Sequence, residues 1–593
     1  MVKLREAFLF MGGYLASQSH ETAVTLAASL ASRINLIPCP LSRFGDNFYA
    51  SLTCNWLSEC LSSEESLETR LVFTIGNHLN LSFLTKVNLS SSEINNGFAA
   101  AISRALTLNS TLNYLDLGHN SIGSAGASRL SQALTVNSTL NHLDLGGNSI
   151  GDAGACRLSQ ALTVNSTLNH LNLGLNSIGD AGASGLSQAL AVNSSLTYLN
   201  LKYNSISDAG ASGLSQALTV NSTLNHLNLG LNIIGAAGAS CLSQALKSNS
   251  SLTCLHLMEN SIGDAGTICF SQALAVNSSL TTLNLSGNDF GDNGASCLSQ
   301  VLAVNTTLTT LLLPNNSIGD AGASCLCEAL KVNSSLTHLD LNQNTNIGED
   351  GAFYLSQALT ENSSLTNLNL SYNDNIGDAG AFFLSQALRV NSSLTTLGLS
   401  KNNISEAGAS SLSQTLAVNS SLSCLDLSGN SIGDDGAFWI SQALGANSSL
   451  TWLNLNTNFI GVAGASCLSQ ALAVNSSLTY LNLDNNSISE AGASCLSQAL
   501  KVNSSLTDLA LYGNSIGDAG ASALSQALAV NSSLSDLNLN ANSIGDAGAF
   551  CLSQALTENS SLTCLRLCFN CFGDAVVDSL NKASKPNTMV LTD

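Results

Sequence analysis

The chain has 593 residues, of which 45% are hydrophobic and 10% are charged, so it is too apolar for a disordered polymer and able to bury a core. Its formal net charge of -21, with only 18 Lys and Arg residues, disfavours nucleic acid and anionic membrane surfaces as partners. Gly, Ser and Asn interrupt every apolar run before it could span a bilayer, so we expect no membrane span.

Residues 1–83 lack the regularity of the rest of the chain, and their alternating apolar and polar stretches indicate short helices. We expect a mostly helical N-terminal cap here, with a small signalling or targeting module as the alternative. The start, "MVKLREAFLFMGGYLASQS", has features of a signal peptide. However, Glu6 borders its apolar run and Gly12 and Gly13 divide it, so we predict an amphipathic helix.

From residue 84 to 593 a unit of 28 residues, twice lengthened to 29, occurs 18 times. One copy, Leu481 to Asp508, reads "LNLDNNSISEAGASCLSQALKVNSSLTD". Its "LxL" has the period of a strand with one buried face, and "AGAxxLxxAL" has helical spacing. One unit cannot bury both apolar surfaces, so the units must stack into a solenoid. Strands lie about 4.8 Å apart and helices roughly 8–10 Å apart, so the stack must curve.

These residues match L-x-x-L-x-L-x-x-N-x-L, and the unit resembles a leucine-rich repeat of the ribonuclease-inhibitor-like subfamily. Similar repeats occur in NOD-like receptors and in the activator of the Ran GTPase. The resemblance implies an α/β horseshoe or superhelix of about 18 repeats, with parallel strands on the concave face and helices on the convex face. It also implies a protein partner, although this scaffold serves many unrelated functions.

Three columns of the repeat are explained by the fold. The asparagine after each strand, a predicted structural ladder, bridges backbone groups of adjacent turns. An acidic column at the start of each helix, which includes Asp152 and Asp180, caps helix amides; calcium binding is the sharper alternative. The asparagine of "VNSSL", which carries a glycosylation pattern at 17 positions from Asn109 to Asn559, ends each helix in a left-handed conformation. The ladder begins with Asn120, Asn148, Asn176, Asn204 and Asn232.

The 17 cysteines are interpreted as free thiols, which suit a reducing compartment. Seven share one helix position and are expected to be buried. A C-terminal cluster could hold a metal but lacks a fourth ligand, so packing is the favoured reading. The seven are Cys241, Cys269, Cys297, Cys325, Cys467, Cys495 and Cys551, and the cluster is Cys564, Cys568 and Cys571.

Two sets of side chains are candidates for partner binding on the concave face. The early repeats carry a row of rings and, between the strand leucines, a row of polar residues: Tyr114, His142, His170, Tyr198 and His226, then Asp116, Asp144, Asn172, Asn200 and Asn228. Three imidazoles in one row cannot converge on one ion, so we expect no metal. A recognition strip and an incidental product of duplication both remain open. The late repeats carry aromatic anchors with an acidic rim suited to a basic protein: Trp452, Tyr480, Asp484, Asp508, Tyr512 and Asp536.

The sequence contains no phosphate-binding G-x-x-x-x-G-K-[ST] loop, no G-x-S-x-G elbow and no H-E-x-x-H helix. We therefore expect no nucleotide, cofactor or catalytic site, and predict a cytoplasmic, non-enzymatic scaffold that binds a protein across its concave face. One alternative is a GTPase activator resembling the Ran activator, although the acidic tail of that family is missing. Others are an innate-immune-type regulator and a secreted or surface recognition protein.

Overall fold

Each repeat folds as its two periodicities predict, into a strand, a turn, a helix and a return turn. In the repeat that begins at Leu481, strand β15 (Tyr480–Asn482) precedes helix α19 (Ser489–Leu500). Leu481 and Leu483 of the strand side and Leu496 of the helix are fully buried. Alternation along the strand and the helical spacing of "AGASCLSQAL" therefore bring these leucines into one core.

The computed structural model describes residues 85–585 and 588–592, and the chain divides into two compact units, Met1–Asn288 and Asp289–Asp593. The predicted N-terminal cap or module at residues 1–83, with its amphipathic helix, lies outside the described residues. The strands of the first unit are β1 (Lys86–Asn88), β2 (Tyr114–Asp116), β3 (His142–Asp144), β4 (His170–Asn172), β5 (Tyr198–Asn200), β6 (His226–Asn228), β7 (Cys254–His256) and β8 (Thr282–Asn284). Its helices are α5 (Asn96–Leu108), α6 (Ser124–Leu134), α7 (Gly151–Leu162), α8 (Asp180–Leu190), α9 (Asp208–Leu218), α10 (Ala236–Leu246) and α11 (Gly263–Leu274).

The second unit continues the same alternation of strand and helix. Besides β15, its strands are β9 (Thr310–Leu312), β10 (His338–Asp340), β11 (Asn367–Asn369), β12 (Thr396–Gly398), β13 (Cys424–Asp426), β14 (Trp452–Asn454), β16 (Asp508–Ala510), β17 (Asp536–Asn538), β18 (Cys564–Arg566) and β19 (Met589–Leu591). Besides α19, its helices are α12 (Asp292–Leu302), α13 (Asp320–Val332), α14 (Glu349–Glu361), α15 (Gly377–Leu388), α16 (Glu406–Leu416), α17 (Gly433–Leu444), α18 (Val462–Leu472), α20 (Gly517–Leu528), α21 (Asp546–Glu558) and α22 (Asp574–Ala583).

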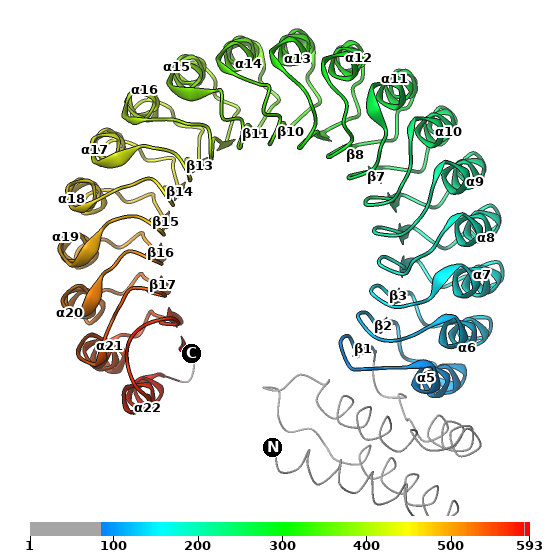
Figure 1. Cartoon of the computed structure of the whole chain (residues 1–593), viewed down its shortest axis with the longest axis horizontal. Coiled ribbons are helices and arrows are strands. Elements are labelled where there is room, and N and C mark those ends of the chain that lie inside the picture. Colours follow the sequence, from blue (N-terminus) through cyan, green and yellow to red (C-terminus); the bar gives the residue numbers. More distant parts are fainter. Residues whose placement is uncertain (1–84, 586–587, 593) are drawn as a thin grey trace, which may run out of the picture. The chain divides into compact units, whose positions relative to one another are not determined.

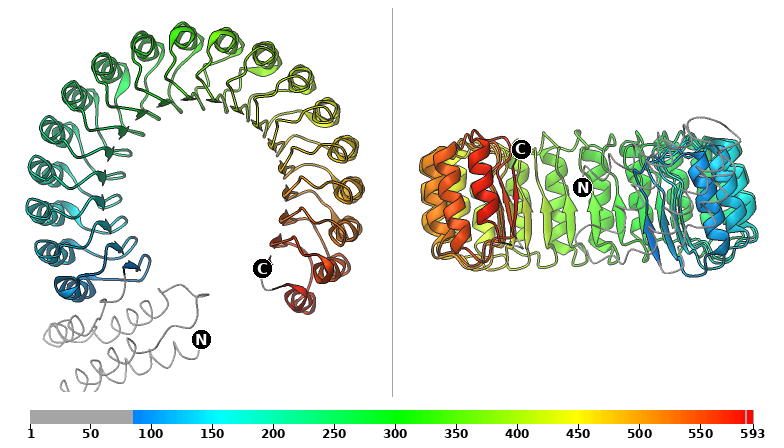
Figure 2. Two further views of the ribbon diagram at one scale, coloured as in Figure 1. Left: turned by 180° about the vertical axis from the view of Figure 1, so that it is seen from behind. Right: turned by 90° about the horizontal axis from the view of Figure 1, so that it is seen from below.

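Within each unit, every strand pairs in parallel with the strand of the next repeat, without a shift in register. Tyr114 lies beside His142, for example, and Leu115 beside Leu143. The strands form the inner side of each unit's arc and the helices its outer side (Figure 1), and consecutive helices stand side by side (Figure 2). The predicted α/β solenoid, with parallel strands on the concave face and helices on the convex face, is confirmed.

The glycine of "AGA" allows consecutive helices to pack closely. A Cβ atom added at Gly210 would lie 3.1 Å from the Cβ of Ala183 in the preceding helix and 2.7 Å from Cγ2 of Ile206. Such separations are tighter than ordinary van der Waals contact. The small residue is therefore required by close packing between repeats.

The asparagine after each strand hydrogen-bonds to the turns of two repeats. The Asn204 Nδ2 donates to the carbonyl oxygens of Leu173, in the preceding repeat, and Leu201 (3.0 and 2.9 Å). Its Oδ1 accepts from the backbone N–H groups of Asn176 and Ile178 (3.1 and 2.8 Å). Equivalent bonds are made by Asn120, Asn148, Asn176 and Asn232.

The asparagine of "VNSSL" forms a second ladder, at the other end of the repeat. The Asn475 Nδ2 donates to the carbonyl oxygens of Leu444 and Asn447 in the preceding repeat (2.8 and 3.0 Å), and its Oδ1 accepts from Ser477 N and Leu478 N (3.1 and 2.8 Å). The predicted left-handed helix stop is wrong: Asn109 has φ -82° and Asn333 has φ -73°. An extended backbone is what turns this amide toward the neighbouring repeat.

The acidic column caps the helix of the next repeat rather than its own. Asp208 begins α9, but its Oδ1 accepts from Gly235 N and Gly238 N (both 2.7 Å), at the start of α10. The same pair of bonds is made by Asn96, Asp152, Asp180, Asp292, Asp320, Asp378, Asp434 and Asp518. The column is thus a set of bonds between repeats.

Where that short carboxylate or amide is replaced, the next helix begins differently. Gly377 follows a repeat with Glu349 at the capping position and has φ +55°, whereas Gly235, capped by Asp208, has φ -96°. Six described helices begin in this way, with φ between +55° and +61° at Gly151, Gly263, Gly377, Gly433, Ser489 and Gly517. The capping position of the preceding repeat is occupied, in the same order, by Ser124, Ala236, Glu349, Glu406, Val462 and Glu490. A glutamate at this position therefore does not substitute for an aspartate.

The fourteen described cysteines are free thiols. The seven that share one helix position, Cys241, Cys269, Cys297, Cys325, Cys467, Cys495 and Cys551, are half-buried, and the prediction of full burial is wrong. Six of them immediately precede a buried leucine and Cys269 precedes the buried Phe270, and successive helix residues lie about 100° apart around the axis. The cysteines consequently lie at the edge of the buried stripe.

Candidate binding surfaces on the strand face

The ring strip consists of Tyr114, His142, His170, Tyr198 and His226, one from each of the strands β2 to β6. Because the strands are in register, successive rings are parallel neighbours. The ring centroids are separated by 4.2, 3.9, 3.8 and 4.4 Å in chain order, and all four pairs are stacked. The structure therefore brings all five predicted residues together as one continuous stack.

Stacking removes water from the imidazoles and opposes their protonation. Burial, and after it the charge of His142, lowers the pKa of His170 to about 4. Burial and then the charge of His256 lower the pKa of His226 to about 4. Burial also raises the pKa of Tyr198, to which the charge of Asp144 adds. At neutral pH the strip is consequently an uncharged aromatic surface with polar edges.

The polar row beside the strip is engaged in the turns that follow the strands. The Asp144 Oδ1 accepts from Gly146 N (2.8 Å), and its Oδ2 accepts from the Asn172 Nδ2 (2.9 Å). Asp116, Asn172, Asn200 and Asn228 likewise accept from the backbone N–H two residues on. This row therefore stabilises the strand ends and is only half-buried, so it can also meet a ligand.

The strip continues beyond its predicted end. The ring of His256, on β7, lies 5.1 Å from that of His226, and the Cys254 Sγ lies 3.2 Å from the His256 Nε2. Burial raises the pKa of the Cys254 thiol to about 11. His256 is visible in the sequence as part of "CLHL". It is not predicted because the rings of the strip share one repeat position, whereas His256 occupies the position of Asn228, two residues later.

The aromatic–acidic patch consists of Trp452, Tyr480, Asp484, Asp508, Tyr512 and Asp536, on strands β14 to β17 and their following turns. Trp452 and Tyr480 stack with centroids 5.1 Å apart and rings 8° from parallel. The Asp484 Oδ1 accepts from Tyr512 N (2.6 Å), which joins two neighbouring turns. Burial raises the pKa of Asp484, although that hydrogen bond opposes the shift.

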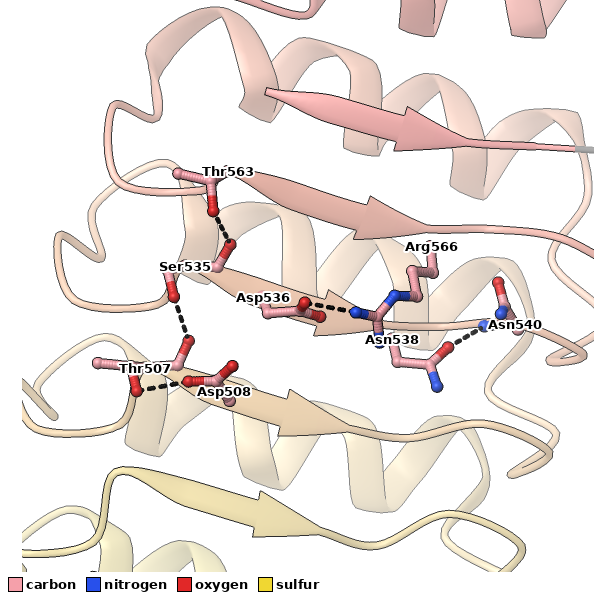
Figure 3. Close-up of polar contacts among 8 residues, drawn as sticks. All are labelled: Thr507, Asp508, Ser535, Asp536, Asn538, Asn540, Thr563 and Arg566. Atoms are coloured by element: carbon pink, nitrogen blue, oxygen red, sulfur yellow. Dashed lines mark hydrogen bonds and ion pairs between the residues drawn. The ribbon is translucent and has the colours of Figure 1, made fainter. Parts of the chain in front are cut away.

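A residue not predicted from the sequence changes the charge of this patch. Arg566, on β18, forms an ion pair with Asp536, with 2.7 Å between Nη2 and Oδ2 (Figure 3). Asp508 lies on β16, next to the strand β17 that carries Asp536, and accepts a hydrogen bond from the Thr507 hydroxyl (2.6 Å). The acidic rim is therefore partly neutralised at Asp536, while Asp508 and Asp484 retain their place beside the aromatic pair.

An exposed row of valines, also unpredicted, follows the helix ends. Each valine immediately precedes the buried asparagine of "VNSSL"; Val474 is 70% exposed and Val502 66%. The same column includes Val136, Val164, Val192, Val220, Val276, Val304, Val332, Val390, Val418 and Val530. This valine row gives each unit an apolar rim that is separate from the strand face.

Among the described residues, one group of three metal-type ligands converges, and it comprises His226, Cys254 and His256. The C-terminal Cys564, Cys568 and Cys571 form no such group within the part of the chain that the structure describes. In the same part, no helix is both long and apolar enough to cross a membrane.

Fifteen stretches of the chain match the family model described as Leucine Rich repeat: residues 108–131, 136–158, 164–187, 192–215, 220–243, 248–271, 276–299, 304–327, 332–356, 361–385, 390–413, 418–440, 474–497, 502–525 and 530–553. These stretches cover more than half of the chain. None of the curated proteins matches it.

The solved structures that are similar to the chain include the following three. A TLR13–ssRNA13 complex is 19% identical over 82% of this chain and 70% of that chain, with a TM-score of 0.47. An internalin (inlF) from Listeria monocytogenes is 22% identical over 64% and 88%, with a TM-score of 0.38. Actin-binding site 2 of leiomodin-1 is 26% identical over 21% and 75%, with a TM-score of 0.21. With TM-scores this low, the family assignment depends on the fifteen matched stretches.

Proposed function

The chain belongs to the leucine-rich repeat family, and from this premise we propose that it is a non-enzymatic scaffold that binds a protein partner across its strand face. The observation that carries the proposal is that each unit presents stacked aromatic rings on in-register strands, the ring strip in the first unit and Trp452 with Tyr480 in the second. Aromatic side chains supply a large contact area at low entropic cost and are enriched at binding hot spots.

We infer that the partner presents basic groups to the aromatic–acidic patch. The chain carries a formal charge of -21, and Asp484 and Asp508 lie beside the aromatic pair. Cationic side chains are attracted both by these carboxylates and by the faces of Trp452 and Tyr480. The same charge opposes phosphate-rich ligands, so we propose no nucleic-acid or nucleotide partner.

We further propose a cytoplasmic location. The "VNSSL" asparagines from Asn137 onward are buried, with Asn475 6% exposed, and the amide nitrogen of Asn475 is used in bonds to the neighbouring repeat. A sugar on such a nitrogen would displace these bonds. A mass shift on endoglycosidase treatment of the native protein would contradict this location and favour the secreted or surface alternative.

We retain residues 1–83 as a proposed N-terminal cap and the ribonuclease-inhibitor-like form as the proposed subfamily. The GTPase-activator alternative would work by presenting polar side chains to a GTPase. Arg566 is the only arginine in the described strands, and its guanidinium is paired with Asp536. Stimulation of GTP hydrolysis across a panel of small GTPases would favour that alternative over the scaffold. The identity of the binding partner would distinguish an innate-immune regulator from both.

The experiment that tests the scaffold is proximity labelling in the native cell, followed by competition with variants of the purified chain. We expect a chain with Trp452→Ala and Tyr480→Ala to lose competition for the partner. Two matched controls should compete fully: Phe438→Ala with Trp439→Ala, an exposed aromatic pair on the helix side, and Val474→Ser with Val502→Ser on the valine row. Equal competition by all three would refute binding through the aromatic–acidic patch.

A further inference from the structure

Three potential metal ligands meet on the strand face of the first unit, where β6 and β7 lie side by side. One ligand atom from each of His226, Cys254 and His256 lies within 4.8 Å of the other two. The Cys254 Sγ and the His256 Nε2 are only 3.2 Å apart. All three side chains are half-buried, so solvent reaches them.

The fold itself produces this convergence. His226 and Cys254 are direct partners in the parallel register, so their Cα atoms are about one strand spacing, roughly 4.8 Å, apart. His256 follows Cys254 by two residues and therefore points to the same face. The ring of His226 is held against Tyr198 at 4.4 Å, which restricts its orientation. The ligands are thus placed on neighbouring strands rather than on a loose loop.

The separations fit a tetrahedral ion after small side-chain rotations. Zn–N bonds of about 2.0–2.1 Å and a Zn–S bond of about 2.3 Å place neighbouring ligand atoms roughly 3.4–3.6 Å apart in a tetrahedron. Two imidazoles and one thiolate form a set that suits zinc and excludes hard ions such as Mg²⁺ and Ca²⁺.

We propose that His226, Cys254 and His256 form a Zn²⁺ site whose fourth position, open to the solvent on the strand face, is taken by water. Binding displaces the proton of the Cys254 thiol to the solvent and leaves a thiolate–zinc bond. The positive charge of Lys202, which acts on His256, opposes the binding of a cation at this site. The negative charge of the Cys254 thiolate offsets that repulsion. The site does not depend on the proposed function.

The test is titration of the full-length, reduced protein with Co²⁺, which reports tetrahedral thiolate coordination by its absorption. We expect one equivalent to produce a thiolate-to-cobalt charge-transfer band and the intense d–d bands of tetrahedral Co²⁺, and Zn²⁺ to abolish both. Cys254→Ser should remove the charge-transfer band. His226→Gln and His256→Gln should each weaken Co²⁺ binding at least tenfold.

The matched control is Cys424→Ser. Cys424 occupies the same strand position in β13 and is equally half-buried, but its register partner is Thr396 and Asp426 stands where β7 has His256. Its titration should equal that of the unmodified chain. A charge-transfer band that persists in Cys254→Ser, or an octahedral spectrum in the unmodified chain, would overturn the proposal. Because the side chains lie on the surface, circular dichroism should show the same fold for every variant.

Discussion

A single short side chain decides how each helix of the array begins. Asp208 accepts from two amides at the start of the next helix, and Gly235 there is extended, whereas Gly263 follows Ala236 and has φ +60°. Where the aspartate caps the helix, the residue at the start of that helix does not need the positive φ that favours glycine. Ser489 is the only non-glycine among the described helix starts with positive φ at this position.

We expect Asp180→Ala to cost more stability than Asp208→Ala. Loss of a helix cap costs about 1–2 kcal/mol. After Asp208→Ala, Gly235 can adopt positive φ, but after Asp180→Ala the residue that must do so is Ser207, which adds strain. Amide hydrogen exchange at the two helix starts measures the difference. Asp180→Asn should restore protection, as Asn96 does naturally, and Asp180→Glu should not; equal rescue by Glu would contradict the mechanism.

The ring strip predicts a pH dependence at the same scale. Burial lowers the pKa of His170 to about 4, below its ordinary value of 6.5. The unfolded chain therefore binds a proton between these values while the folded chain does not, and this contribution lowers stability as pH falls from 6.5 toward 4. We expect His170→Gln to lose less stability over this interval than the unmodified chain. A His170 ring that titrates near pH 6.5 by NMR would contradict the stacked environment.

At the scale of the element, the two asparagine ladders are the bonds that join one repeat to the next. Each places one amide between two turns and satisfies backbone groups that the solenoid buries. The sequence predicts the first ladder, because that asparagine follows the strand in a known position. It does not predict the second, because "LxxALxxN" has the local pattern of a helix stop and its hydrogen-bond partners are 28 and 31 residues away.

We expect Asn475→Ala to destabilise the chain by about 2–4 kcal/mol, because several buried hydrogen bonds of about 1 kcal/mol each are lost and their backbone partners are left unsatisfied. Amide hydrogen exchange at Ser477 and Leu478 should accelerate most, since these N–H groups donate to Asn475. Ser476→Ala, at the exposed neighbouring position, is the control and should change neither quantity. An unaffected Asn475→Ala would show that the ladder contributes little.

At the scale of the whole molecule, the fold follows from the sequence and the contacts between repeats follow only in part. Two periodicities and a fixed period specify strand, helix and stacking. Arg566 beside Asp536 and His256 beside His226 come from different columns of adjacent repeats, so alignment column by column does not reveal them. The aspartate caps are also not revealed by such an alignment, because the carboxylate and the amides that it caps belong to different repeats.

Removal of one whole repeat should leave the rest intact, because each repeat contacts its neighbours alone. Deletion of Glu406 to Gly433, 28 residues, would place Gly436 where Gly408 now meets Asp378 and would spare both candidate surfaces. We expect a cooperatively unfolding protein with unchanged circular dichroism per residue. Deletion of 14 residues, Glu406 to Asn419, would remove α16 and leave β12 and β13 without the helix between them, and should misfold; a stable product would contradict the stacking scheme.

The most direct test of the scaffold proposal is the dissociation constant of the partner identified by proximity labelling, measured by calorimetry. For Trp452→Ala with Tyr480→Ala we predict an increase of at least about 30-fold, the effect of losing one hot spot of about 2 kcal/mol. Asp508→Asn should weaken binding most at low salt, where the partner's basic groups are least screened. A dissociation constant unchanged by the aromatic pair but raised by Phe438→Ala with Trp439→Ala would place binding on the helices and contradict the account.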